Sequence, residues 1–306
     1  MGVESRTVAR PGTGMFYVAA AAVLFASKGL FSKALYQRGV GFELLVTVRA
    51  LLAMPLFVWF ALHSNRGAQA TAPAPLRAYV AASLAGIIGY YAGALVDFWA
   101  LELIDASIER VLLFSYPALV VLISSFTRRR APERRIVLAM AVTYAGIFFA
   151  MGGIDLSELR ANLYGASLVL IAALTTAIYF LIGERYVHQL GSTRFAAVGM
   201  SSSAVVLALH FALFRSFDEV VALDAHDWLL LGILGIACMF VPGLMQAEGV
   251  RRVGAQRAAI GSTVGPPTTI LLAALFLGER LNGWQLLGSA MIVVSVLLMS
   301  LRPAGD

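Results

Sequence analysis

Charged residues are scarce in this sequence of 306 residues. They make up 13% of it, whereas 60% of the residues are apolar and the mean hydropathy is +0.83. A soluble chain averages about 25% charged residues, because its surface must be wetted. The lack of charge therefore excludes an ordinary water-soluble protein and indicates a chain surrounded largely by lipid.

Residues that hold metals or perform catalysis are also few. Cys238 is the single cysteine, which excludes an intrachain disulfide and a cysteine-rich metal site. The four histidines are scattered without the HExxH spacing of a zinc enzyme, and no Walker loop occurs. No acid–base constellation of an intramembrane enzyme is found either. We therefore expect no enzyme activity, no metal, no cofactor and no direct use of ATP.

Long apolar segments fill the sequence instead. A membrane-spanning helix needs about 20 mostly apolar residues, and ten segments qualify. They are 14–36, 41–62, 78–101, 106–126, 135–152, 162–183, 195–214, 227–247, 256–277 and 283–301. The first segment lacks the architecture of a cleaved signal peptide and reads as a retained span. The sequence predicts an all-α polytopic membrane protein with ten transmembrane helices.

The basic residues predict the orientation of these spans. Fifteen of the 23 Lys and Arg residues fall on the side of the N-terminus, and five fall on the opposite side. Positive residues are enriched in cytoplasmic loops, so both termini are expected in the cytoplasm, with the protein in the cytoplasmic (inner) membrane. The run Arg128–Arg130, with Arg134 and Arg135, could bind nucleic acid or anionic lipid. Its position between two spans favours a topology anchor, and no nucleic-acid partner is expected.

The sequence also repeats. Shifting it by 149 residues places spans three to five on spans eight to ten without a gap. The matched pairs include Gly86 and Gly235, Ala106 and Ala255, Pro117 and Pro266, Leu122 and Leu271, and Leu138 and Leu287. Five spans in each half require the second copy to be inserted upside down. The sequence therefore predicts two inverted five-helix repeats, 14–152 and 162–301, an arrangement typical of secondary transporters.

Candidate substrate-binding residues are polar, aromatic or sulfur-containing and lie in the spans. A polar group within lipid is costly and marks a functional site by default. The candidates are Lys28, Tyr90, Tyr91, Asp97, Thr175, Tyr179, Met239, Phe240, Gln246 and Ser262. Two structural alternatives remain open. The small residues around them could serve close helix packing, and Lys28, Arg49 and Asp97 could form a purely structural ion-pair cluster.

Prolines occupy equivalent positions in the two halves. Pro117 lies inside span four, and Pro266 and Pro267 lie inside span nine. Proline removes a backbone hydrogen bond and kinks a helix. Matching breaks in both halves predict a binding site or a hinge, with a static kink as the alternative.

A family resemblance rests on a short motif near the end of the chain. Gly278-Glu279-Arg280-Leu281, followed by Gln285 and Gly288, resembles the end of the EamA-type module of the drug/metabolite transporter superfamily. Lys33 and Arg49 are similar to recurrent basic residues of that module. The first half departs from it, because Arg129-Arg130-Ala131-Pro132 stands in place of the motif. The resemblance implies ten helices in two inverted repeats, around a cavity lined by spans 1, 3, 4, 6, 8 and 9.

Within this superfamily the chain is most similar to bacterial exporters of aromatic and other neutral amino acids. The leading hypothesis is a secondary transporter that exports such amino acids or similar metabolites by alternating access. The expected partners are a small-molecule substrate and the lipid bilayer, with a monomer as the assumed state. An exchanger for phosphorylated sugars is the alternative within transport. A membrane receptor or intramembrane enzyme is the alternative from another class.

The predicted orientation can be tested by cysteine labelling. Cysteines introduced at Ser5 and at Thr127 should resist a membrane-impermeant thiol reagent added to intact cells, because both positions are expected to face the cytoplasm. Both should react after the cells are permeabilised. Labelling of both in intact cells would contradict the predicted topology.

Overall fold

The computed structural model describes residues 11–64, 74–103, 109, 112–150, 163–277 and 283–300. Within these ranges the chain forms helices and connecting turns, and no strand occurs. The first half contains α1 (Pro11–Gln37), α2 (Phe42–Ser64), α3 (Leu76–Gly86), η1 (Ile87–Ala92), α4 (Gly93–Leu103), α6 (Tyr116–Arg128) and α7 (Arg134–Ala150).

The second half follows the same order. It contains α9 (Leu163–Leu190), α10 (Ser192–Phe214), α11 (Asp218–Val221), α12 (Ala225–Gly235), η2 (Ile236–Phe240), α13 (Val241–Gly261), η3 (Ser262–Val264), α14 (Gly265–Leu277) and α15 (Gly283–Ser300). The expected all-helical fold is confirmed. Lipid offers no hydrogen bonds, so a helix must satisfy its own backbone.

Six helices in the described part of the chain are long and apolar enough to cross a membrane. One of them runs from Ala225 to Thr268 and therefore holds span eight and the start of span nine. It turns a corner at Gly254, whose φ of 79° favours glycine. Glu184 caps the helix that follows, because its carboxylate accepts a hydrogen bond from the Ala255 N–H at 3.1 Å.

Spans three and eight are interrupted at matching places. Each contains a π-helical segment, Ile87–Ala92 in span three and Ile236–Phe240 in span eight. The 149-residue shift maps the start of one onto the start of the other, and the segment in span three is one residue longer. π-Helical turns are rare and occur frequently at functional sites. The two interruptions therefore direct attention to the centre of both helices.

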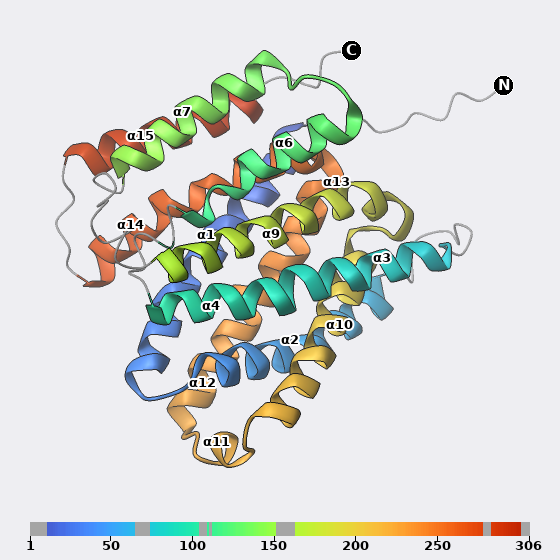
Figure 1. Cartoon of the computed structure of the whole chain (residues 1–306), viewed down its shortest axis with the longest axis vertical. Helices are drawn as coiled ribbons and strands as arrows, with labels where there is room; N and C mark the ends of the chain where they lie inside the picture. Colours follow the sequence, from blue (N-terminus) through green and yellow to red (C-terminus); the bar gives the residue numbers. More distant parts are fainter. Residues whose placement is uncertain are drawn as a thin grey trace.

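The two halves are interleaved rather than side by side. Helix α1 packs against α13, and the corresponding helices of the other half, α9 and α3–α4, also pack against each other. Helix α2 packs against α10, and α7 packs against α15 at the upper end of the view in Figure 1. Every one of these pairs joins a helix of the first half to a helix of the second.

Two repeat-equivalent glycines allow close helix crossings. A Cβ at Gly86 would lie 1.9 Å from the carbonyl oxygen of Gly199 in α10. A Cβ at Gly235 would lie 2.8 Å from the carbonyl oxygen of Arg49 in α2. Small residues let helix backbones approach closely in membranes, where packing drives association. These contacts hold spans three and eight against α10 and α2.

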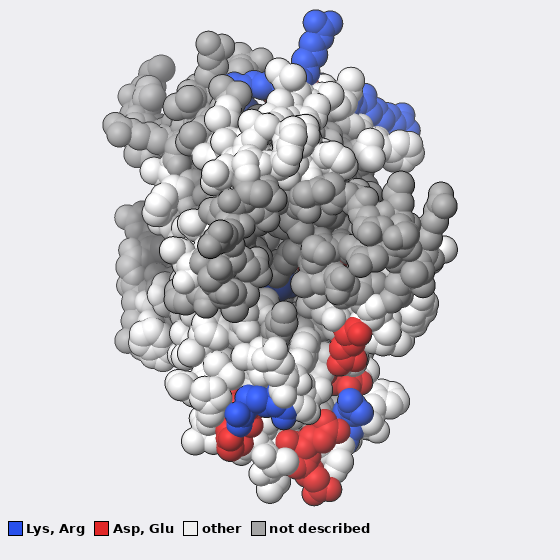
Figure 2. All heavy atoms as spheres, turned by 90° about the vertical axis from the view of Figure 1, so that its left-hand side faces the viewer, with Lys and Arg blue, Asp and Glu red and all other residues white. Residues whose placement is uncertain are grey.

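Acidic and basic side chains gather at the lower end of the view in Figure 2. Arg38 pairs with Asp224 and Asp227, and Arg215 pairs with Glu43. These ion pairs tie the ends of α1 and α10 to the starts of α2 and α12. The Asp227 N–H, together with Arg38, lowers the pKa of the Asp224 carboxyl. A basic side chain is also visible in a hollow near the centre of this view.

Replacing either crossing glycine with alanine should destabilise the protein. We expect Gly86→Ala to lower the free energy of unfolding by about 3 kcal/mol or more, and Gly235→Ala by about 1–3 kcal/mol, because a methyl group would overlap backbone atoms. Gly232→Ala is the matched control in α12, where a Cβ meets nothing within 4 Å. Helix propensity alone should leave that control unchanged or stabilise it by about 0.5–1 kcal/mol. Thermal unfolding in detergent measures the stability of all three variants. Equal stability of the two crossing variants and the control would contradict the close crossings.

Candidate functional site

A cavity of about 170 Å³ lies at the centre of the helices. Its wall is formed by α1, η1, α4, the segment 113–116, α9, η2, α13, η3 and α14, with one residue from α2. These elements belong to spans 1, 3, 4, 6, 8 and 9, except for that single contribution of span two. Its volume suits a small metabolite rather than a drug-sized ligand, whose pocket typically spans about 300–1,000 Å³.

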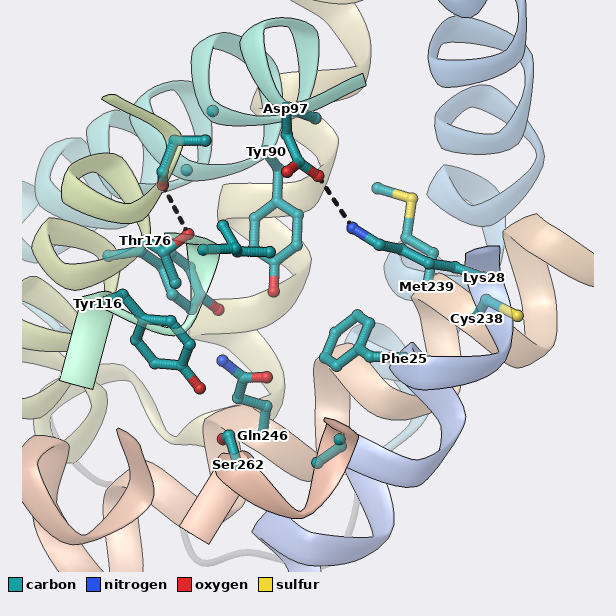
Figure 3. Close-up of a pocket in the computed structure, with 18 of the residues that line it drawn as sticks. Phe25, Lys28, Tyr90, Asp97, Tyr116, Thr176, Cys238, Met239, Gln246 and Ser262 are labelled. Atoms are coloured by element: carbon teal, nitrogen blue, oxygen red, sulfur yellow. Dashed lines mark hydrogen bonds and ion pairs between the residues drawn. The ribbon is translucent and has the colours of Figure 1, made fainter. Parts of the chain in front are cut away.

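One side of the cavity is charged. Lys28 of α1 donates a hydrogen bond to the Asp97 carboxylate of α4 at 2.9 Å (Figure 3). The two side chains are 14% and 8% exposed. Phe98 lies beside this pair, with its ring centroid 5.1 Å from Lys28 Nζ and 4.5 Å from Arg49 Cζ. Two cations thus lie over one aromatic ring, and one of them is paired with a carboxylate.

The opposite side of the cavity is polar and uncharged. Figure 3 shows the Gln246 amide pointing into the cavity from this side, beside Ser262. The Tyr116 hydroxyl donates to the carbonyl of Ala259 at 3.3 Å, and the Thr176 hydroxyl donates to that of Ala172 at 2.9 Å. This side offers hydrogen bonds without offering charge.

Aromatic rings separate the two polar sides. Tyr90 points between them in Figure 3, and Phe25 faces it. The Tyr90 ring meets Tyr179 edge to face, with centroids 5.0 Å apart and planes at 88°. A molecule that fits here meets charge at one end, aromatic surface in the middle and neutral hydrogen-bonding groups at the other end.

Positions equivalent under the 149-residue shift line the cavity together. Asp97 and Gln246 approach from opposite sides, as their repeat equivalence predicts. The equivalent lining pairs are Gly89 and Cys238, Tyr90 and Met239, Asp97 and Gln246, Leu113 and Ser262, and Tyr116 and Gly265. Both π-helical segments thus contribute cavity residues from the middle of their spans.

Seven of the ten candidate residues line the cavity. They are Lys28, Tyr90, Asp97, Tyr179, Met239, Gln246 and Ser262. Tyr91, Thr175 and Phe240 are not among the described lining residues.

Tyr91 and Phe240 each follow a lining residue by one position. The Tyr91 hydroxyl is 3.1 Å from His210 Nδ1 of α10. Phe240 packs edge to face on Phe57 of α2, with centroids 4.9 Å apart. The direction of the side chain turns by about 100° from one helical residue to the next, and here that turn carries Tyr91 toward α10 and Phe240 toward α2.

Thr175 packs at a close contact between helices α9 and α4. Its hydroxyl donates to the carbonyl of Ala172 at 2.8 Å, and a Cβ at Gly93 would lie 2.3 Å from its Oγ1. The neighbouring Thr176 lines the cavity in its place. The structure also adds Phe25, Arg49 and Tyr116 to the wall. Phe25 shares a helix stripe with Lys28, a signal that the sequence already contains.

The candidate hinge prolines begin helices instead of bending continuous ones. Pro117 lies in the first turn of α6, after a turn at Phe114–Ser115, and Pro266 and Pro267 lie at the start of α14, after η3. Proline is tolerated there because the first N–H groups of a helix have no internal partner. The two breaks lie at equivalent positions, and their role as hinges stays a prediction. The motif Gly278–Leu281 lies outside the described residues.

The apolar spans, the interleaved halves and the central polar cavity together define a multi-pass membrane transporter. The sequence matches the EamA-like transporter family twice, over residues 12–152 and 163–301. The chain therefore belongs to this family of transporters, within the drug/metabolite transporter superfamily, and is not an enzyme.

Individual relatives agree with this assignment. The chain is 30% identical over 288 residues to the uncharacterized transporter YcbK of Bacillus subtilis (strain 168), covering 93% of this chain and 92% of the relative. It is 22% identical to the uncharacterized inner membrane transporter YicL of Salmonella typhimurium (strain LT2), covering 94% and 95%. A solved crystal structure shares the fold with a TM-score of 0.74 at 19% identity, covering 93% and 95% of the two chains.

The ion pair at the charged side can be tested by removing one partner at a time. Lys28→Met should lower the free energy of unfolding by about 3–5 kcal/mol, because the buried Asp97 carboxylate would lose the hydrogen-bonded ammonium 2.9 Å away. The double variant Lys28→Met, Asp97→Asn should recover most of the loss. Thermal or chemical unfolding in detergent measures both, and equal stability of the single and double variants would argue against the pair.

Proposed function

We propose that this protein is a secondary transporter of the cytoplasmic membrane that exports small amphipathic metabolites by alternating access. Aromatic and other neutral amino acids are the leading substrates. The observation that carries the proposal is the central cavity, built from equivalent residues of both halves. It offers charge at one end, aromatic surface in the middle and neutral hydrogen bonds at the other end.

The arrangement of the helices supports ten spans in two inverted repeats, 14–152 and 162–301. The pairing of α1 with α13 is the repeat image of the pairing of α9 with α3–α4. Alternating access follows naturally from such symmetry, because exchanging the conformations of the two halves would move the opening from one side to the other. The breaks before Pro117 and Pro266 are then the places where the halves bend.

The chemistry of the cavity supports an amino acid or a related carboxylate. A carboxylate and an ammonium must both be paired when they leave water. Lys28, Arg49 and Asp97 supply both signs of charge at one end. Tyr90, Tyr179 and Met239 provide surface that suits an aromatic or thioether side chain.

An exchanger for phosphorylated sugars is less well supported. A phosphate monoester carries nearly two negative charges and favours several cations. The described part of the cavity wall holds two cations, and one of them is paired with Asp97.

Both termini are proposed to be cytoplasmic, in agreement with the split of basic residues.

Flux into proteoliposomes tests the proposal. Purified protein should exchange radiolabelled aromatic or neutral amino acids across the membrane faster than protein-free liposomes do. Ala172→Trp should block this flux, because Ala172 lines the cavity and an indole would fill it. Leu170→Trp is the matched control in α9, where residue 170 is 46% exposed on the outer surface of the helices. Absence of flux, or equal flux in both variants, would contradict the proposal.

A further inference from the structure

Charge in the described cavity wall does not balance. Lys28 and Arg49 are cations, and Asp97 is the one carboxylate among the described lining residues. Lys28 is committed to Asp97 by the 2.9 Å ion pair. The site therefore has one cation left over for a ligand.

Arg49 is that cation, and it is buried. It is 6% exposed, and its guanidinium lies against the ring of Phe98. The structure gives it no hydrogen bond or ion pair with any described residue, and its Nε is a buried donor without a partner. An arginine cannot release its proton in a protein, so burial leaves a permanent charge to be neutralised. Burial of an unpaired charge is costly, which makes an anion favourable at this position.

The position of Arg49 suits a ligand rather than the structure of the bundle. It is the one residue of α2 among the described lining residues, whereas the other lining elements belong to spans 1, 3, 4, 6, 8 and 9. Its backbone already serves packing, because the Arg49 carbonyl lies against Gly235. Its side chain continues past that contact to the cavity wall. A guanidinium presents parallel N–H donors that match the two oxygens of a carboxylate.

We propose that Arg49 binds the carboxylate of the transported molecule, while Lys28 and Asp97 keep each other neutral. This assignment rests on the proposed function and names its substrate class: organic molecules with one carboxylate and an apolar or aromatic body. The carboxylate meets Arg49 beside Phe98, and the body lies along Tyr90 toward Gln246. An amino acid and a simple carboxylic acid share this chemistry. They differ in whether Asp97 must turn from Lys28 to an ammonium.

Four probes with the same ring and chain separate these cases. They are 3-phenylpropanoate, phenylalanine, 3-phenylpropanamide and 2-phenylethylamine, which are an anion, a zwitterion, a neutral amide and a cation. Binding to purified protein in nanodiscs is measured by calorimetry. The wild type should bind the two carboxylates at least roughly tenfold more tightly than the amide and the amine, since one charged hydrogen bond is worth about that factor. Equal binding of 3-phenylpropanoate and its amide would overturn the assignment.

Variants connect that preference to Arg49. Arg49→Met should weaken both carboxylates by roughly tenfold or more, without changing the affinity for the amide. Arg49→Lys keeps the positive charge but loses the paired N–H donors of the guanidinium. Its affinity for the carboxylates should therefore lie between those of the wild type and Arg49→Met. Arg252→Met is the matched control, because Arg252 also lies over an aromatic ring, 4.9 Å from the centroid of Tyr17, but is paired with Glu248. It should bind the carboxylates as the wild type does.

Stability without ligand gives an independent readout. Arg49→Met removes an unpaired charge, so its unfolding temperature should equal or exceed that of the wild type, whereas Lys28→Met should lower it. A large loss of stability in Arg49→Met would show that Arg49 has a structural partner and would overturn the assignment. In liposomes, a wild type that moves no metabolite refutes the proposed function itself. Equal KM for carboxylates in the wild type and in Arg49→Met refutes only the role of Arg49.

Discussion

The ion pair between Lys28 and Asp97 is the interaction on which the centre of this protein depends. Each charge is buried among the helices, where little water is available to solvate it, and each is tolerated because the other is 2.9 Å away. The pair joins α1 to α4 across the cavity wall. It therefore fixes one end of the cavity and leaves Arg49 as the cation without a described partner.

Close backbone contact is the second requirement of the fold. Gly86 and Gly235 bring spans three and eight against α10 and α2. Both glycines immediately precede a π-helical segment, and each segment supplies cavity residues. In each half, one stretch of chain thus makes the close helix crossing and also supplies residues that line the cavity. An extra residue in a helical turn changes which side chains face inward, so the π segments also set which residues reach the cavity.

The repeat in the sequence explains much of the cavity. Asp97 and Gln246 occupy equivalent positions, yet one is charged and the other is neutral. Tyr90 and Met239 are likewise equivalent in place and different in chemistry. Divergence at equivalent positions gives the cavity two unlike ends, and such a cavity can orient an amphipathic molecule. In the proposed function, the symmetry of the backbone serves movement between states, and the asymmetry of the side chains serves recognition of the substrate.

The sequence by itself determined the membrane class, the apolar spans and the polar faces that supply Lys28, Asp97, Tyr90 and Gln246. These follow from composition and helical periodicity, which act locally along the chain. Only the tertiary structure decided which of two adjacent residues faces the cavity, as with Tyr90 and Tyr91 or Met239 and Phe240. It also decided that Arg49 of α2 reaches the wall and that Thr175 packs against Gly93. The reason is that the rotation of a helix about its axis is set by the helices packed against it, and those contacts come from distant parts of the chain.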